Sequence, residues 1–113
     1  MDDKREHQRI KRNITAKFYL KNAPEKKYYV SQIIDISNGG LKFFTYEKFK
    51  WGDEIVFEVY FPFLYPRATF LEGRVVGIKD IMVGKTAHVS VEFINMTPAL
   101  QDTLATFEKF NKT

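Results

Sequence analysis

Six short runs in which apolar and polar residues alternate constrain the fold more than any other feature of the sequence. In the clearest run, 54–61, four apolar side chains fall on one face: Ile55, Phe57, Val59 and Phe61. Similar runs occupy residues 14–20, 28–37, 41–46, 69–78 and 88–94. The chain is also 16% aromatic, and aromatic residues favour strands. These runs predict six β-strands, each with one face buried.

The period of the pattern changes after the sixth run. Thr97 offers a capping hydroxyl, and Pro98 suits the first turn of a helix. Apolar residues then recur at helical spacing: Leu100, Leu104, Phe107 and Phe110. The pattern predicts an amphipathic helix over residues 98–110. Six short strands and one helix predict an all-β fold, a six-stranded antiparallel barrel with a C-terminal α-helix, since a barrel leaves no open edges.

Two details refine this barrel. Gly73 and Gly77 fall inside the fifth run, where glycine predicts bends or bulges. The apolar loop 63–66 is either an exposed contact surface or a cap over one end of the core, and we expect the cap.

Length and composition limit the class of protein. The 113 residues favour one domain, and the net charge of +4 is weaker than expected of a dedicated DNA-binding protein. There is no cysteine, and His7 and His88 show no metal-ligand spacing. Because no run is long enough to cross a bilayer and residues 1–12 do not read as a signal peptide, we expect a cytoplasmic protein.

Residues 1–12 differ in composition from the rest of the chain. Ile10 is their one apolar residue after the initiator, and basic side chains prevail. They cannot bury an apolar face, so we expect a mobile basic N-terminal arm at 1–12 and a barrel at 13–113. The arm is either a solvated tail or a segment that orders on a ligand.

Residues 35–40, called here the 35–40 turn, connect the second and third strands. Asp35 and Ser37 are two apart, so on a strand they point to one face, while Ile34 and Ile36 point to the other. The two glycines after Asn38 can take positive φ and let a ligand approach the backbone. The segment is either a plain turn or a binding site.

The sequence shows no basis for catalysis. It has no Ser-His-Asp or Cys-His arrangement, and Gly39-Gly40 is not a phosphate loop because the Lys-Ser/Thr of that motif is absent. Binding is better supported. Arginine forks fit phosphate and the O6/N7 edge of guanine, and Asp35 suits the N–H groups of its other edge. A ligand with both guanine and phosphate would use all these groups, with the arm closing over it.

Two motifs together resemble a known family. Arg5 and Arg9 form Arg-x-x-x-Arg, and residues 35–40 have the pattern Asp-x-Ser-x-x-Gly, with 25 residues between Arg9 and Asp35. Two further segments contribute to the resemblance: Gly73-Arg74-Val75-Val76 and Val91-Glu92-Phe93. In this order the motifs resemble those of a PilZ domain. The resemblance implies a six-stranded barrel and a receptor for the bacterial second messenger cyclic di-GMP, without a cofactor or metal.

The resemblance also implies roles for particular residues. Arg5 and Arg9 would hold guanine and phosphate, Asp35 and Ser37 would meet a guanine edge, and Gly40 would shape the turn. We add three neighbours to the expected site: Lys4, Asn38 and Gly39. A basic residue before the first motif arginine, as Lys4 is, implies two stacked ligand molecules. Ser90 departs from the glycine that is common before Val-Glu-Phe and is expected to crowd or re-tune the pocket.

The sequence leaves three functions open. The first is a cyclic di-GMP sensor that signals through its arm and surface to a protein partner, in motility or biofilm control. The second is a protein-interaction module of the same fold in pilus or flagellar control, with a vestigial site. The third is a small basic barrel that binds nucleic acid through exposed aromatics, which the modest charge disfavours. No membrane contact is expected.

Overall fold

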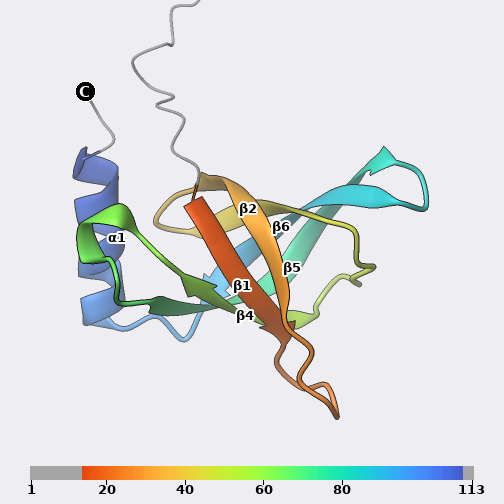
Figure 1. Ribbon diagram of the computed structural model, residues 1–113, viewed down its shortest axis with the longest axis horizontal. Coiled ribbons are helices and arrows are strands. Elements are labelled where there is room, and N and C mark those ends of the chain that lie inside the picture. Colours follow the sequence, from red (N-terminus) through yellow and green to blue (C-terminus); the bar gives the residue numbers. More distant parts are fainter. Residues whose placement is uncertain (1–13, 111–113) are drawn as a thin grey trace, which may run out of the picture.

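The computed structural model describes residues 14–110, in which six strands form one closed antiparallel barrel (Figure 1). The strands are β1 (Ile14–Leu20), β2 (Tyr29–Ile36), β3 (Gly40–Thr45), β4 (Glu54–Val59), β5 (Thr69–Met82) and β6 (Thr86–Ile94). A 3₁₀ turn, η1 (Pro62–Leu64), and one helix, α1 (Pro98–Phe110), complete the fold. The order around the barrel is β1-β2-β3-β6-β5-β4. The predicted barrel with a C-terminal helix is confirmed.

The predicted boundaries hold best where alternation is unbroken. The bounds of β1 and α1 are those predicted, and β2, β3 and β4 differ from their predicted runs by one or two residues. The largest error is at residues 80–85, predicted as a turn. Asp80 pairs with Ala87 and Met82 with Thr86, so cross-strand pairing extends the hairpin almost to Gly84, which supplies the positive φ of its tip.

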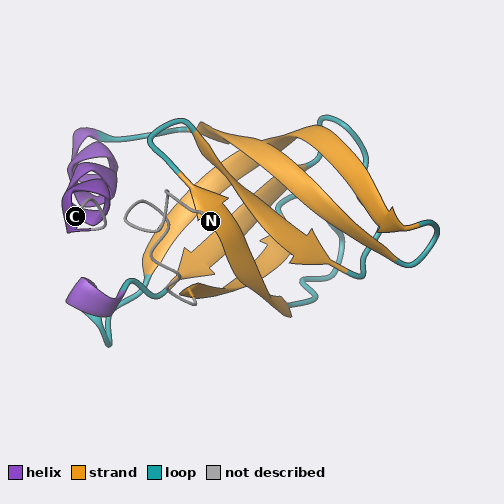
Figure 2. Cartoon of the chain, turned by 90° about the horizontal axis from the view of Figure 1, so that it is seen from above, coloured by secondary structure: helices purple, strands orange, loops and turns teal. Residues whose placement is uncertain are grey.

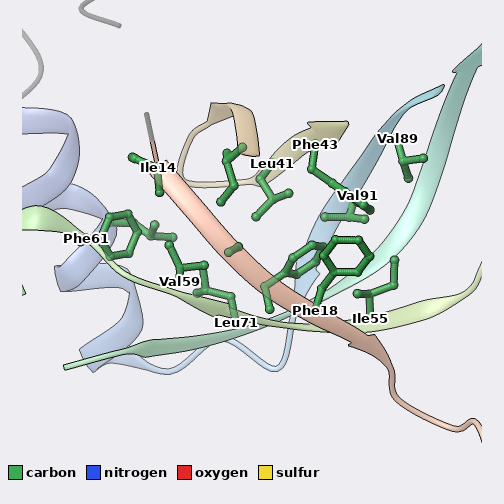
Figure 3. Close-up of a cluster of buried hydrophobic side chains, with 14 of the residues drawn as sticks. Ile14, Phe18, Leu41, Phe43, Ile55, Val59, Phe61, Leu71, Val89 and Val91 are labelled. Atoms are coloured by element: carbon green, nitrogen blue, oxygen red, sulfur yellow. The ribbon is translucent and has the colours of Figure 1, made fainter. Parts of the chain in front are cut away.

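The barrel interior is an aromatic core (Figure 3). All four apolar residues of the clearest run are fully buried, at 0% exposure: Ile55, Phe57, Val59 and Phe61. Phe18 and Phe43 lie among them with ring centroids 4.8 Å apart. Aromatic pairs at such distances add favourable contact beyond their buried area. The predicted inward face is therefore the core.

Helix α1 closes one end of the barrel, where η1 also lies (Figure 2). The hydroxyl of Thr97 accepts a hydrogen bond from the Leu100 N–H at 3.1 Å, which caps the helix as predicted. Leu104 and Phe107 are buried, and the Phe107 ring lies 5.0 Å from that of Phe61. The predicted cap at 63–66 is only partly right, since Tyr65 is 74% exposed.

Three register shifts interrupt the regular strand pairing, and one of them, between Asp80 and Met82, lies near the tip of the β5–β6 hairpin. Another falls between Ile33 and Asp35, and it turns Ile34 outward while Ile36 packs against the core. The expectation that Ile34 and Ile36 share a face is therefore wrong. The third falls between Val75 and Gly77, as predicted for that glycine.

Gly73 has a different role from the predicted bend. It pairs regularly with Phe93, and a Cβ built on it would lie 2.6 Å from Val91 Cγ2. Gly73 therefore permits close packing between β5 and β6.

Some predicted features lie outside the residues that the structure describes. They are the arm at 1–12, His7 and the side chain of Phe110. Within 14–110, no helix is long and apolar enough to span a membrane, and no three metal-binding side chains gather.

The packing of α1 gives a test of the fold. Leu104→Ala should lower the free energy of unfolding by about 2–5 kcal/mol, because it empties a fully buried position. Gln101→Ala on the exposed face of the same helix should change it by less than about 0.5 kcal/mol. Urea denaturation of both variants measures the difference. Equal losses would mean that α1 does not close the barrel.

Candidate functional site

The 35–40 turn joins the end of β2 to the start of β3 through its own hydrogen bonds. The Ser37 N–H donates to the Gly40 carbonyl at 2.9 Å, and the Gly39 N–H donates to Ser37 Oγ at 3.3 Å. Serine hydroxyls commonly close turns in this way. Asp35, Ser37, Asn38 and Gly39 are all exposed. The turn is therefore well defined and open to solvent.

Gly40 lies in close contact with β6. It pairs with Glu92, and the Phe93 N–H donates to the Gly39 carbonyl at 2.9 Å. A Cβ built on Gly40 would lie only 2.1 Å from the Val91 carbonyl oxygen. Only glycine fits there without moving the backbone, so this residue fixes how the turn sits against β6.

Gly39 contrasts with its neighbour. A Cβ built on Gly39 would meet nothing within 4 Å. Neither glycine adopts positive φ, which among the described glycines occurs only at Gly52 and Gly84. The two glycines of the turn are therefore not equivalent, and close approach rather than positive φ explains Gly40.

Strand register brings further side chains beside the turn. Asp35 pairs with Lys42 of β3, and Lys42 pairs with Ser90 of β6. Residues directly opposite on adjacent strands point to the same face. Asp35 therefore shares the outer face with a lysine that the sequence reasoning missed. The sequence did contain a signal for this lysine, because Lys42 lies two residues after Gly40 and strand periodicity places both on one face.

A second row of side chains crosses the outer face from the turn. Gly40 is opposite Glu92, Glu92 is opposite Arg74, and Arg74 is opposite Glu54. Arg74 contacts both carboxylates, with Nη1 at 3.2 Å from Glu92 and Nη2 at 3.5 Å from Glu54. Exposed ion pairs contribute little stability. Their effect here is to offset the negative charge of Glu92 beside the turn.

The row of charges continues away from the turn. Lys21 Nζ lies 2.8 Å from Glu72 Oε1 and 3.7 Å from Glu54 Oε1. The hydrogen bond from Lys21 lowers the pKa of the Glu72 carboxyl and raises that of Lys21. Because the pKa of Glu72 is lowered and that of Lys21 is raised, both side chains stay charged near neutral pH, and they form the end of this row of charges away from the turn.

The chain enters the barrel close to Asp35. Ile14, the first described residue, pairs with Ile33 of β2, two residues before Asp35. Lys4, Arg5 and Arg9 lie outside the described residues. Arg9 precedes Ile14 by five residues, a span of at most about 17 Å of extended chain. The structure thus brings five of the eight expected site residues together and fixes where the segment with the other three begins.

The family model described as "PilZ domain" matches residues 3–108. The PilZ domain of YcgR from Escherichia coli, solved with c-di-GMP, is similar in structure, with a TM-score of 0.63 and 17% identity. That match covers 84% of this chain and 80% of the YcgR chain.

Two structures of K. pneumonia MrkH are also similar. The first has a TM-score of 0.68 and 16% identity, and it covers 97% of this chain but 49% of that one. The second, in its apo state, has a TM-score of 0.63 and 17% identity, and it covers 99% and 55%. The chain thus spans about half the length of the MrkH chains. No curated protein matches significantly. At these identities the solved structures show a common fold.

The two glycines of the turn provide a matched test. Gly40→Ala should destabilise the protein by about 1–3 kcal/mol or more, because the new methyl group would overlap the Val91 carbonyl. Gly39→Ala should cost less than about 0.5 kcal/mol, because its Cβ points into open space. Thermal unfolding of both variants measures the difference. Similar midpoints for the two would show that β3 does not approach β6 this closely.

Proposed function

The chain belongs to the PilZ domain family, and we propose that it is a receptor that binds cyclic di-GMP at the 35–40 turn, without catalysis. The observation that carries the proposal is the position of Asp35. Its carboxylate is exposed, and within residues 14–110 it has no hydrogen-bond or ion-pair partner. A carboxylate held on a rigid strand end is available to accept the N–H groups of a guanine edge.

The remaining groups of the turn suit the same ligand. Ser37 offers a hydroxyl next to the guanine position, and Asn38 offers an amide on the exposed side of the turn. Gly39 leaves open space above the backbone, so a ligand can approach it closely. Lys42, opposite Asp35 in the register, adds a cation for a phosphate. The similarity to a PilZ domain solved with c-di-GMP supports this assignment.

The arginines of the N-terminal segment complete the proposed site. The chain enters β1 beside Asp35, and the short span from Ile14 to Arg9 keeps Arg9 within reach of a ligand on the turn. Arg5 and Arg9 carry the forks that fit phosphate and guanine. In this proposal the segment closes on the ligand and changes the surface that a protein partner reads. The proposed setting is the bacterial cytoplasm, and the proposed outputs are motility or biofilm control.

Ser90 affects this site only at its margin. It is separated from Asp35 by Lys42, and two strand spacings amount to about 10 Å. Its side chain therefore borders the proposed phosphate position rather than the guanine position. We expect Ser90 to tune affinity without preventing binding.

Calorimetric titration with cyclic di-GMP tests the proposal. Wild type should bind, and Arg9→Ala should weaken binding by about thirtyfold or more, equivalent to about 2 kcal/mol, because a charge-assisted contact is lost. Asp35→Ala should weaken cyclic di-GMP far more than cyclic di-AMP, since adenine does not present the same N–H donors. Asp102→Ala, a matched change on the exposed face of α1, should bind as wild type does.

The outcomes separate the roles of the residues. Wild-type affinity in Arg9→Ala, in a protein that binds, would remove the arginine from the site. Equal losses for both nucleotides in Asp35→Ala would make Asp35 a structural residue of the turn. No binding by the folded wild type would reject the receptor and favour a protein-interaction module with a vestigial site.

The number of ligands follows from Lys4. Two stacked dinucleotides bring four phosphates together, and Lys4 beside Arg5 supplies a further cation to offset their repulsion. We therefore expect two ligands per chain in wild type and one in Lys4→Ala, measured as the calorimetric ratio. A ratio of one in both proteins would reject the stacked pair while leaving binding at the turn intact.

A further inference from the structure

The β5–β6 hairpin projects from the end of the barrel opposite α1 (Figure 1). On one side, β5 pairs with β6 from Glu72 to Met82. On its other side it pairs with β4 only from Thr69 to Arg74, and the Gly52–Asp53 segment continues this as far as Val75. From Val76 to Met82, no strand among residues 14–110 pairs with this side. We call this stretch the free β5 edge.

The free β5 edge combines exposed apolar side chains with two exposed charged ones, Lys79 and Asp80. Large apolar side chains lie along it and at the hairpin tip, with the following exposures: Val76 39%, Ile81 51%, Met82 56% and Val83 84%. An unpaired edge offers a row of backbone donors and acceptors to any extended chain. Proteins usually protect such an edge with charges, proline or a covering segment. Here Lys79, Asp80 and the register shift after Asp80 give only partial protection, because the edge contains no proline and no strand among residues 14–110 pairs with it. The edge can therefore pair with another strand.

A pocket of about 250 Å³ opens beside the free β5 edge. It lies between residues 46–49 and the inner side of the hairpin. Its apolar lining comes from both: Phe49, Ile78, Ala87 and Val89. This volume suits a bulky apolar side chain. Because alternate residues of a strand point to opposite faces, a strand added at the edge would direct every second side chain toward the pocket.

Charges around the edge indicate what the other side chains would be. Lys79 is exposed and paired with His88, on the outer face of the hairpin. The pocket lining also includes four charged residues: Lys48, Lys85, Glu47 and Asp80. An added strand would place outward-facing residues next to Lys79, where opposite charge is favourable. The geometry therefore favours apolar residues facing the pocket and acidic residues facing out.

From these features we propose that the free β5 edge binds an extended segment of a partner protein in which apolar and acidic residues alternate. The segment adds a strand to β5, so main-chain hydrogen bonds supply affinity, and the pocket selects the apolar residue. A second copy of this chain fits less well. The antiparallel register that pairs the whole stretch from Val76 to Met82 would place Lys79 opposite its own copy, and like charges directly opposite are destabilising.

This surface is separate from the proposed nucleotide site. Along the β3–β6 pair, Gly40 is opposite Glu92, whereas Thr45 beside the pocket is opposite Ala87. Five residues of strand separate the two positions by about 17 Å. The proposal for this partner surface can therefore be tested independently of nucleotide binding.

The test uses the full chain and a synthetic peptide, acetyl-Ser-Glu-Phe-Glu-Ile-Glu-Ser-amide. Trp51 is the single tryptophan of the chain, is 69% exposed and adjoins Gly52, which bonds to β5, so its fluorescence reports binding. Binding should protect the amides of residues 76–82 from hydrogen exchange.

Replacing the three glutamates of the peptide with lysines should weaken binding by about tenfold or more. N-methylation of the peptide amides that face β5 should abolish binding. N-methylation of the amides that point away from β5 should leave binding unchanged.

Protein variants complete the test. Lys79→Glu should reverse the preference between the acidic and basic peptides while leaving cyclic di-GMP affinity unchanged. Lys17→Glu, an exposed lysine on β1, should change neither. No binding of the acidic peptide by the folded protein would overturn the proposal. Binding that does not depend on which peptide edge is methylated would also overturn it. A concentration-dependent dimer would overturn it too, if hydrogen exchange shows that a second copy of the chain occupies the free β5 edge.

Discussion

The close approach of β3 to β6 at Gly40 is the contact on which the rest of the structure depends. It joins the first three strands of the chain to the other half of the barrel, because β3 and β6 are neighbours in space but far apart in sequence. The Gly39 carbonyl accepts the Phe93 N–H, and the missing Cβ of Gly40 lets the backbone lie against the Val91 carbonyl. Closure of the barrel between β3 and β6 and the shape of the turn therefore depend on the same contact.

This closure explains how the functional groups are distributed. The aromatic core fills the barrel, and α1 covers one end through Leu104 and Phe107. A rigid body of this kind can hold Asp35 and Ser37 at a strand end, and the proposal assigns the arginine contacts to the segment before Ile14. The opposite end has no helix to cover it in the described chain, and the β5–β6 hairpin there carries its own pocket and open edge. The two proposed surfaces thus belong to two ends of one barrel.

Sequence pattern predicted the fold well where side chains alternate without interruption. Ile55, Phe57 and Val59 are buried as expected, because strand periodicity decides their face. It failed at Ile34, where a bulge adds a residue that no local signal marks. It also missed the extension of β5 to Met82, because pairing with β6 outweighed the turn preference of Asp80 and Gly84.

The candidate site was predicted only in part, for a different physical reason. The motif residues of the turn are adjacent in sequence, so their proximity follows directly. The neighbours Arg74, Glu92 and Ser90 reach the same face through the register of β3, β6 and β5, which no local pattern specifies. The roles of Lys4, Arg5 and Arg9 stay predictions, because those residues lie outside the described structure.

The most direct test of the central claim maps cyclic di-GMP onto the amide NMR spectrum of the uniformly ¹⁵N-labelled protein. The account predicts shifts concentrated at the amides of Asp35, Ser37, Gly39 and Gly40 and at the adjoining Glu92 and Phe93, with residues 79–86 of the hairpin unchanged. Shifts that gather at the hairpin pocket and leave the 35–40 turn untouched would contradict it.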